Sequence, residues 1–112
     1  MARILHLEDD SEVRVRFRAL MAEEGHEVTT FRSCKKALEA HKQESFDLYV
    51  CGQLGKYSDG LAFAADMQQQ NEKVLIISDK QKFSKIPYVS VHLLTHRGDY
   101  IRERIRMMVT GG

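Results

Sequence analysis

The sequence has no long apolar run and almost no net charge. Its apolar runs, such as Val74 to Ile77, are far shorter than the about 20 residues that a membrane-spanning helix needs. Seventeen Lys and Arg residues face sixteen Asp and Glu residues, which leaves a formal net charge of +1. We therefore expect neither a transmembrane helix nor a basic surface for nucleic acid or an anionic membrane.

Cysteines and targeting signals are also scarce. Cys34 and Cys51 are too few for a disulfide framework and lack metal-site spacing, so we interpret them as free, buried thiols, in preference to a redox pair. The first residues lead directly into a strand-like stretch without a secretory leader. The sequence has no nucleophile–base pair and no dinucleotide motif. We predict a cytoplasmic protein that is not an enzyme and has no cofactor.

The composition that remains is that of an ordinary globular domain. The chain has 112 residues, of which 43% are hydrophobic and 29% are charged. This length suits one domain, because a second hydrophobic core does not fit. We predict a single domain over residues 1–109, and we interpret residues 110–112 as a linker stub to a further domain.

Short apolar strands alternate with amphipathic helices along the chain. Strands are expected at 3–7, 27–31, 46–51, 74–77 and 88–94, and helices at 11–24, 33–42, 61–70 and after residue 99. Ser11 and Asp99 are the expected caps of the first and last helices. This order predicts an α/β fold, a flavodoxin-like doubly wound sheet of five parallel strands with helices on both faces. Its ligand crevice lies at the carboxyl ends of the strands.

The segments at these strand ends follow a characteristic order. An apolar strand runs into the acidic turn Glu8-Asp9-Asp10, a second ends at Cys51, a loop ends in Asp59-Gly60, and Val74-Leu75-Ile76-Ile77 leads to a hydroxyl residue, Ser78. In this order and spacing the motifs resemble the receiver domain of response regulators over nearly the whole chain. The resemblance implies the CheY-like fold with strand order 2-1-3-4-5, and a role in two-component signalling.

The resemblance also implies a phosphorylation site, and this sequence lacks the central residue of that site. Receivers transfer a phosphoryl group to an aspartate that ends the third strand, and here that position falls on Gly52, which has no side chain. Glu8 and Asp9 match the acidic pair and Ser78 matches the hydroxyl residue, whereas Val91 stands at the lysine position. Without a third carboxylate, Glu8 and Asp9 would bind Mg²⁺ weakly, and we favour a solvated acidic turn over a metal site.

The segment after Ser78 is short for this family. Only nine residues, 79–87, separate Ser78 from the strand that begins at Tyr88, too few for a packed helix and two connections. We therefore predict that the fourth helix is missing or reduced to one turn. The uncovered surface beside the last strand and last helix is the expected partner surface, with Tyr88, His92, Tyr100 and Arg102.

The leading interpretation is a pseudo-receiver, a protein–protein interaction module that works without phosphorylation. Its partner would be a protein, such as a fused output domain or a second copy of the chain, with no nucleic acid or membrane involved. One alternative is phosphorylation at another carboxylate such as Asp59, and a second is a small-molecule sensor that uses the space beside Gly52. An acyl-linked phosphate, or another acid lying where the side chain of residue 52 would point, would contradict the leading interpretation.

Overall fold

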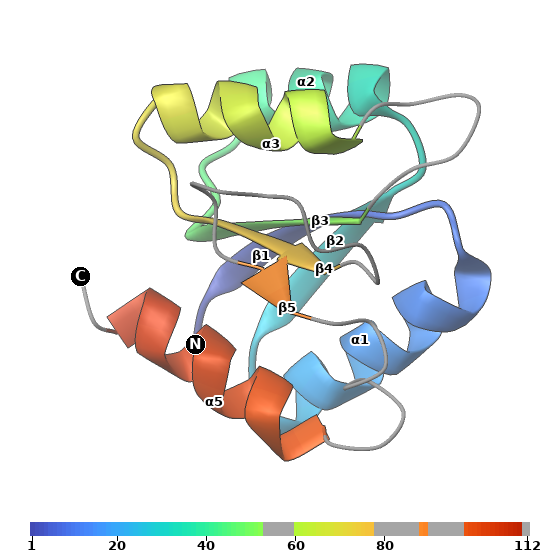
Figure 1. Cartoon of the computed structure of the whole chain (residues 1–112), viewed down its shortest axis with the longest axis vertical. Coiled ribbons are helices and arrows are strands. Elements are labelled where there is room, and N and C mark those ends of the chain that lie inside the picture. Colours follow the sequence, from blue (N-terminus) through green and yellow to red (C-terminus); the bar gives the residue numbers. More distant parts are fainter. Residues whose placement is uncertain (53–59, 78–87, 90–97, 111–112) are drawn as a thin grey trace.

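Parallel strands form one sheet of order β2-β1-β3-β4-β5, as Figure 1 shows. The computed structural model describes residues 1–52, 60–77, 88–89 and 98–110. The strands are β1 (Arg3–Leu7), β2 (Glu27–Phe31), β3 (Leu48–Gly52), β4 (Val74–Ile77) and β5 (Tyr88–Val89). The helices in the described part are α1 (Ser11–Glu23), α2 (Cys34–Gln43), α3 (Gly60–Gln69) and α5 (Gly98–Thr110). The predicted α/β fold and the order 2-1-3-4 of its first four strands are confirmed.

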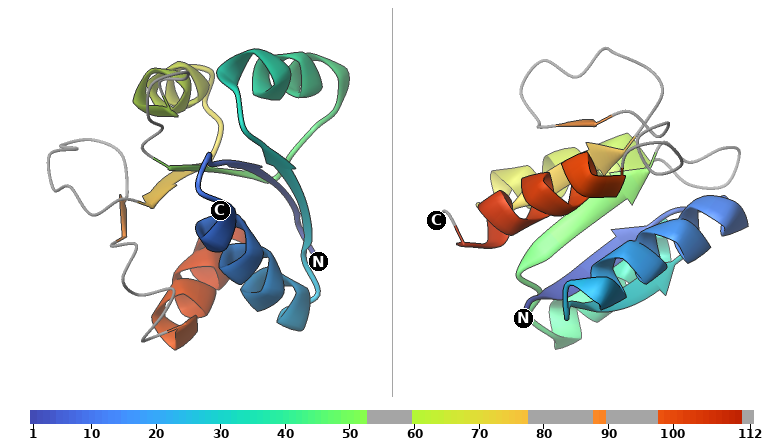
Figure 2. Two further views of the ribbon diagram at one scale, coloured as in Figure 1. Left: turned by 90° about the vertical axis from the view of Figure 1, so that its right-hand side faces the viewer. Right: turned by 90° about the horizontal axis from the view of Figure 1, so that it is seen from below.

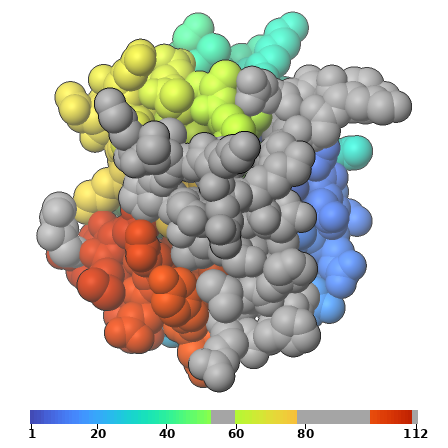
Figure 3. All heavy atoms as spheres, in the orientation of Figure 1, coloured from blue at the N-terminus to red at the C-terminus, as the bar shows by residue number. Residues whose placement is uncertain are grey.

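The helices cover both faces of the sheet, α1 and α5 on one side and α2 and α3 on the other (Figure 2). Successive side chains of a strand point to opposite faces, so each strand supplies both cores. Leu48 and Val50 of β3 enter the core under α1 and α5, whereas Tyr49 and Cys51 enter the core under α2 and α3. In the space-filling view, α3 and α5 lie at opposite ends of the molecule (Figure 3).

Burial on both faces explains the sequence of the central strands. All residues of β3 and β4 are buried, and both strands read as apolar runs without polar alternation. The expected third strand, 46–51, is two residues early at its start and one residue short at its end. Asp47 lies before β3, where its N–H donates to the carbonyl of Arg3 at 2.7 Å, and Gly52 is the last residue of β3.

The helix caps differ from the prediction at two positions. Asp10, not Ser11, caps α1, because its carboxylate accepts hydrogen bonds from the N–H groups of Glu12 and Val13. Asp99 lies inside the first turn of α5, which begins at Gly98. Gly25 follows α1 with a φ of 78°, a left-handed conformation that favours glycine and ends the helix.

Some expectations fall on residues outside the described part of the chain. These are the continuation of the last strand to residue 94 and the shortened fourth helix within 79–87. Both remain predictions, as does the division into a domain and a linker stub. Among the residues that the structure describes, no helix is long and apolar enough to cross a membrane.

Candidate functional site

The candidate site lies at the carboxyl ends of β1 and β3, which are neighbours in the sheet. Leu7 of β1 pairs with Cys51 of β3, so the next residues, Glu8 and Gly52, lie side by side. The N–H of Glu8 donates to the carbonyl of Phe31 at 2.9 Å, which ties the turn to β2 as well. The sheet register therefore brings together the first acidic residue and the position that lacks a side chain.

The Glu8 carboxyl group is folded inward over Gly52. Only 5% of Glu8 is exposed, and its Oε2 accepts hydrogen bonds from the backbone N–H groups of Asp9 at 3.1 Å and Asp10 at 3.2 Å. A Cβ atom added to Gly52 would lie 2.6 Å from Cδ of Glu8 and closer still to its Oε1. The space where a side chain at position 52 would begin is therefore filled by Glu8.

Burial determines the acidity of this carboxyl group. Removal from water raises the pKa of Glu8 to about 7, and the neighbouring charges of Asp9 and Asp10 also raise it. The two backbone hydrogen bonds act in the opposite direction, but they do not offset the burial. At neutral pH a large share of Glu8 is therefore protonated and carries no charge.

This arrangement meets one of the two conditions that would contradict the leading interpretation, because an acid does lie where the side chain of residue 52 would point. It also bears on the small-molecule alternative. The room that glycine leaves is occupied by the Glu8 carboxyl group, so it is not open to a ligand in this conformation. The leading interpretation therefore requires that Glu8 itself does not accept a phosphoryl group, which depends on its exposure and its charge.

The acidic turn is solvated only in part, because Glu8 is buried whereas Asp9 and Asp10 are exposed. Mg²⁺ prefers an octahedral set of oxygen ligands. Within the described residues, no three side chains of the types that bind metals come together. Glu8 directs one oxygen to two N–H groups and the other toward Gly52, while Asp9 and Asp10 are exposed. The described residues thus show no complete ligand set for Mg²⁺, and the weak site considered at Glu8 and Asp9 stays a prediction.

The structure describes only some of the other predicted site residues. Ser78, Asp59, Val91 and His92 lie outside the described residues. The backbone of Tyr88 lies in β5.

Two residues of the expected partner surface lie on α5. Tyr100 is 49% exposed there. Arg102 is less available to a partner than the sequence indicated. It forms ion pairs with Glu23 of α1 and, at 2.9 Å, with Asp99. A second pair, between Glu24 and Arg106, also joins α1 to α5. Arg102 therefore holds two helices together within this domain.

His6 is a buried polar residue that the sequence analysis did not single out. It is fully buried in β1 against the ring of Phe17, with 4.4 Å between the ring centroids. Within the described part of the chain, neither ring nitrogen has a hydrogen-bond partner. Burial, with a smaller contribution from the charge of Arg14, lowers the pKa of His6 to about 3. A histidine inside the apolar run 4–7 was the available sequence signal.

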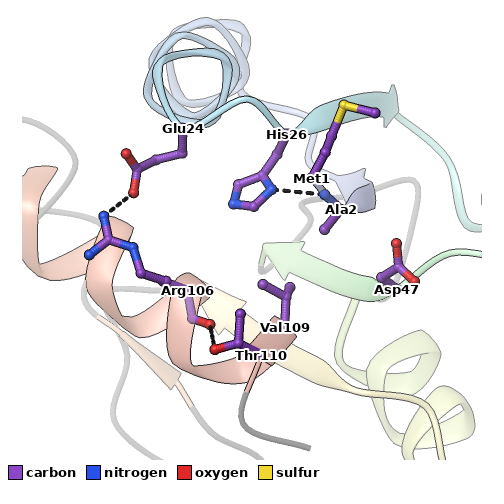
Figure 4. Close-up of a pocket in the computed structure, with 8 residues that line it drawn as sticks. All are labelled: Met1, Ala2, Glu24, His26, Asp47, Arg106, Val109 and Thr110. Atoms are coloured by element: carbon purple, nitrogen blue, oxygen red, sulfur yellow. Dashed lines mark hydrogen bonds and ion pairs between the residues drawn. The ribbon is translucent and has the colours of Figure 1, made fainter.

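A cavity of about 360 Å³ lies at the opposite end of the sheet (Figure 4). Some of its polar groups are already paired: Arg106 contacts Glu24, and His26 Nδ1 accepts a hydrogen bond from the N–H of Ala2 at 3.0 Å. Sequence reasoning did not predict it, because its wall combines segments distant in sequence. The residues that line it are Met1, Ala2, Glu24, His26, Asp47, Arg106, Val109 and Thr110.

Comparison with known families identifies the class of protein. The family model of the response regulator receiver domain matches residues 4–101. This chain belongs to that family, the CheY-like receiver domains of two-component signal transduction. Receiver domains are in general non-catalytic signalling modules. No curated protein sequence is similar enough to this chain to count as a relative.

Solved structures share the fold at low sequence identity. Response regulator TrrA from Thermotoga maritima, in complex with Mg²⁺-BeF, is 20% identical with a TM-score of 0.83, covering 96% of this chain and 99% of that one. TrrA bound to histidine kinase ThkA is 19% identical with a TM-score of 0.80, covering 98% and 100%. Chemotaxis protein CheY4 from Vibrio cholerae is 15% identical with a TM-score of 0.82, covering 96% and 98%. At these identities the likeness concerns the fold alone.

Proposed function

We propose that this receiver domain works without phosphorylation, as a protein–protein interaction module in bacterial two-component-type signalling. The observation that carries the proposal is the pair Gly52 and Glu8. The position that ends β3 offers no carboxylate, and the Glu8 carboxyl group is folded over it. The sheet, the two cores and the helices α1, α2, α3 and α5 are present in the described residues, and a fold can persist when its chemistry is lost.

Glu8 is the residue that competes most directly with this proposal. An acyl phosphate forms when an ionised, accessible carboxylate attacks a phosphoryl donor. Glu8 is 5% exposed, and burial raises its pKa to about 7, so the group is poorly accessible and only partly ionised at neutral pH. Its Oε2 is engaged by two backbone N–H groups. These features make Glu8 a weak acceptor.

Incubation with acetyl phosphate and Mg²⁺, followed by intact mass measurement, tests the proposal. We expect no gain of the mass of one phosphate in the wild-type chain. Glu8→Gln and Asp59→Asn serve as matched variants: a phosphate present in the wild type and absent from one of them would contradict the proposal and identify the acceptor. A receiver with an intact acceptor aspartate is the positive control.

The proposed partner is a protein. TrrA, which shares this fold, forms a complex with a histidine kinase. In this chain the partner surface that we propose comprises Tyr88, His92, Tyr100 and Arg102, of which Tyr100 is exposed on α5. Met107, 63% exposed, lies two turns further along the same helix face. A second copy of this chain, a fused output domain and a separate signalling protein are the candidate partners.

Sedimentation and affinity capture test two of these candidates, a second copy of the chain and a separate signalling protein. Sedimentation of the purified chain over a concentration series detects a homodimer, and capture with the chain as bait, followed by reconstitution from purified components, detects a separate partner. We expect Tyr100→Ala to weaken whichever of these two associations is detected. Val15→Ala is the matched control, because Val15 is 68% exposed on α1. An equal loss in both variants would contradict the assignment to α5.

A further inference from the structure

The contact between Glu8 and Gly52 is specific to this pair of residues. Any residue other than glycine would bring a Cβ atom to within 2.6 Å of Cδ of Glu8, closer than carbon atoms approach without a bond. We propose that the Glu8 carboxyl group is the built-in occupant of the space that a side chain at position 52 would fill, and that this contact keeps the site at the end of β3 closed. The inference rests on the proposed function for its biological meaning and on packing for its geometry.

The backbone of Glu8 is held in place by hydrogen bonds, so its side chain is the part that can move. The N–H of Glu8 donates to the carbonyl of Phe31 at 2.9 Å, and the carbonyl of Glu8 accepts a hydrogen bond from the guanidinium of Arg14 at 3.0 Å. Residue 8 is thus attached to β2 on one side and to α1 on the other. If residue 52 acquires a side chain, the Glu8 carboxyl group must rotate outward, because its backbone is attached at both ends.

Outward rotation breaks specific hydrogen bonds. The N–H groups of Asp9 and Asp10 both donate to Oε2 of Glu8, and both lose this acceptor when the carboxyl group leaves. Removing the Glu8 side chain beforehand removes the clash together with the hydrogen bonds. Substitutions at positions 8 and 52 are therefore expected to be strongly non-additive, as is usual for residues in direct contact.

A double-mutant cycle of Gly52→Ala and Glu8→Ala tests the proposal, with thermal melting and the backbone amide resonances of Asp9 and Asp10 as readouts. We expect Gly52→Ala to lower the melting temperature by no more than a few degrees in the wild-type background, because the end of a flexible side chain yields, and to have no cost in the Glu8→Ala background. The amide resonances of Asp9 and Asp10 should shift in Gly52→Ala toward their positions in Glu8→Ala. Glu12→Ala, at an exposed residue of α1, is the matched control and should be additive with Gly52→Ala.

The outcomes separate this inference from the proposed function. An equal drop in melting temperature in both backgrounds, or unchanged Asp9 and Asp10 amide resonances in Gly52→Ala, would overturn the inference and leave phosphorylation independence standing. An acyl phosphate on the wild-type chain would overturn the function without changing the cycle. If Gly52→Ala does not fold, the double variant must fold, and failure of the double variant also overturns the inference.

Discussion

The polar groups at the two ends of the sheet differ in burial and in hydrogen bonding. At the amino end, the N–H of Arg3 donates to Oδ2 of Asp47 at 2.8 Å, and the N–H of Asp47 donates back to the carbonyl of Arg3 at 2.7 Å. Arg3 also contacts Glu44, and its Nη1 donates to the carbonyl of Ser45 at 3.1 Å. These groups are paired and at least partly in contact with water. This end carries ordinary surface chemistry.

At the carboxyl end, by contrast, two ionisable side chains are buried within three residues of each other. Glu8 keeps a carboxyl group out of water, and His6 keeps an imidazole in the core without a described partner. Buried polar groups that lack full hydrogen bonding lower stability, and such exceptions cluster at functional sites. The comparison teaches that buried, incompletely hydrogen-bonded groups lie at the carboxyl end of the sheet, whereas the groups at the amino end are paired and more exposed.

The largest expected effect comes from His6→Leu and depends on pH. The unfolded chain protonates this histidine below its usual pKa of 6.5, whereas folded His6 is protonated only near 3, so acid favours unfolding. We expect the variant to be more stable than the wild type by about 1–3 kcal/mol at neutral pH, because two buried nitrogens without a partner among the described residues are removed. The advantage should grow by about 2–3 kcal/mol at about pH 4.5.

Urea unfolding of both proteins in metal-free buffer, from neutral to acid pH, measures this difference. Other titrating groups are common to both proteins and cancel in it. A gap that stays constant as the pH falls would show that folded His6 is protonated as readily as the unfolded residue. The two ends of the sheet would then differ less than the structure indicates.

Glu8→Gln should act with the opposite pH dependence. The folded-state pKa of Glu8 is raised from 4.5 to about 7, so the stability that the protonated acid contributes is complete below 4.5 and is lost as the pH rises through about 7. Gln does not ionise, so we expect the variant to exceed the wild type by about 1–2 kcal/mol at mildly alkaline pH, after allowance for solvent screening. Below the pKa of a free glutamate the two should be equal. Chemical unfolding at both pH values measures this, and equal stability throughout would contradict a buried Glu8.

A smaller effect is expected at the amino end. Asp47→Ala removes the acceptor of the Arg3 N–H, and the group exposed by this loss can turn to water. We expect a decrease of about 0.5–1.5 kcal/mol in the free energy of unfolding. Asp47→Asn keeps a side-chain oxygen and should recover part of the loss. A decrease larger than the effect of either substitution at the carboxyl end would reverse the comparison.

The smallest expected effect is on phosphorylation by Gly52→Asp. Restoring a carboxylate at position 52 places it against Glu8, and Val91 stands where the family has a lysine. We expect little or no phosphate by intact mass after incubation with acetyl phosphate and Mg²⁺. Stoichiometric phosphorylation would show that the rest of the site is competent and that the glycine alone keeps it inactive.

Most of the fold was predictable because it rests on local patterns. β1, β2 and β4 have the predicted ends, since apolar runs bounded by polar turns mark buried parallel strands. The errors lie at the ends of helices and strands, because side-chain hydrogen bonds help to determine where an element begins and ends. Asp10 rather than Ser11 caps α1, because the acidic turn places its carboxylate over the first N–H groups.

The candidate site was predictable in its composition and not in its packing. The spacing of the motifs identified Glu8 and Gly52, but nothing in the sequence states that a carboxyl group three atoms from its Cα folds over a neighbouring strand. That contact depends on the register of β1 against β3 and on the side-chain torsions of one residue. The isolation of His6 likewise follows from its position beneath α1, where polar partners are lacking in the described structure.

The ion pairs between α1 and α5 make the contact between these two helices sensitive to salt. Glu23 with Arg102 and Glu24 with Arg106 join the two helices at the surface. On the other face, His41 of α2 forms hydrogen bonds with the hydroxyl of the buried Tyr49 of β3 and with Gln70, which follows α3. Dissolved ions screen exposed charges over about 8 Å at physiological ionic strength. The contribution of these ion pairs to the contact between α1 and α5 therefore decreases as the salt concentration rises. The hydrogen bonds around Tyr49 are affected less, because they do not depend on a pair of exposed charges.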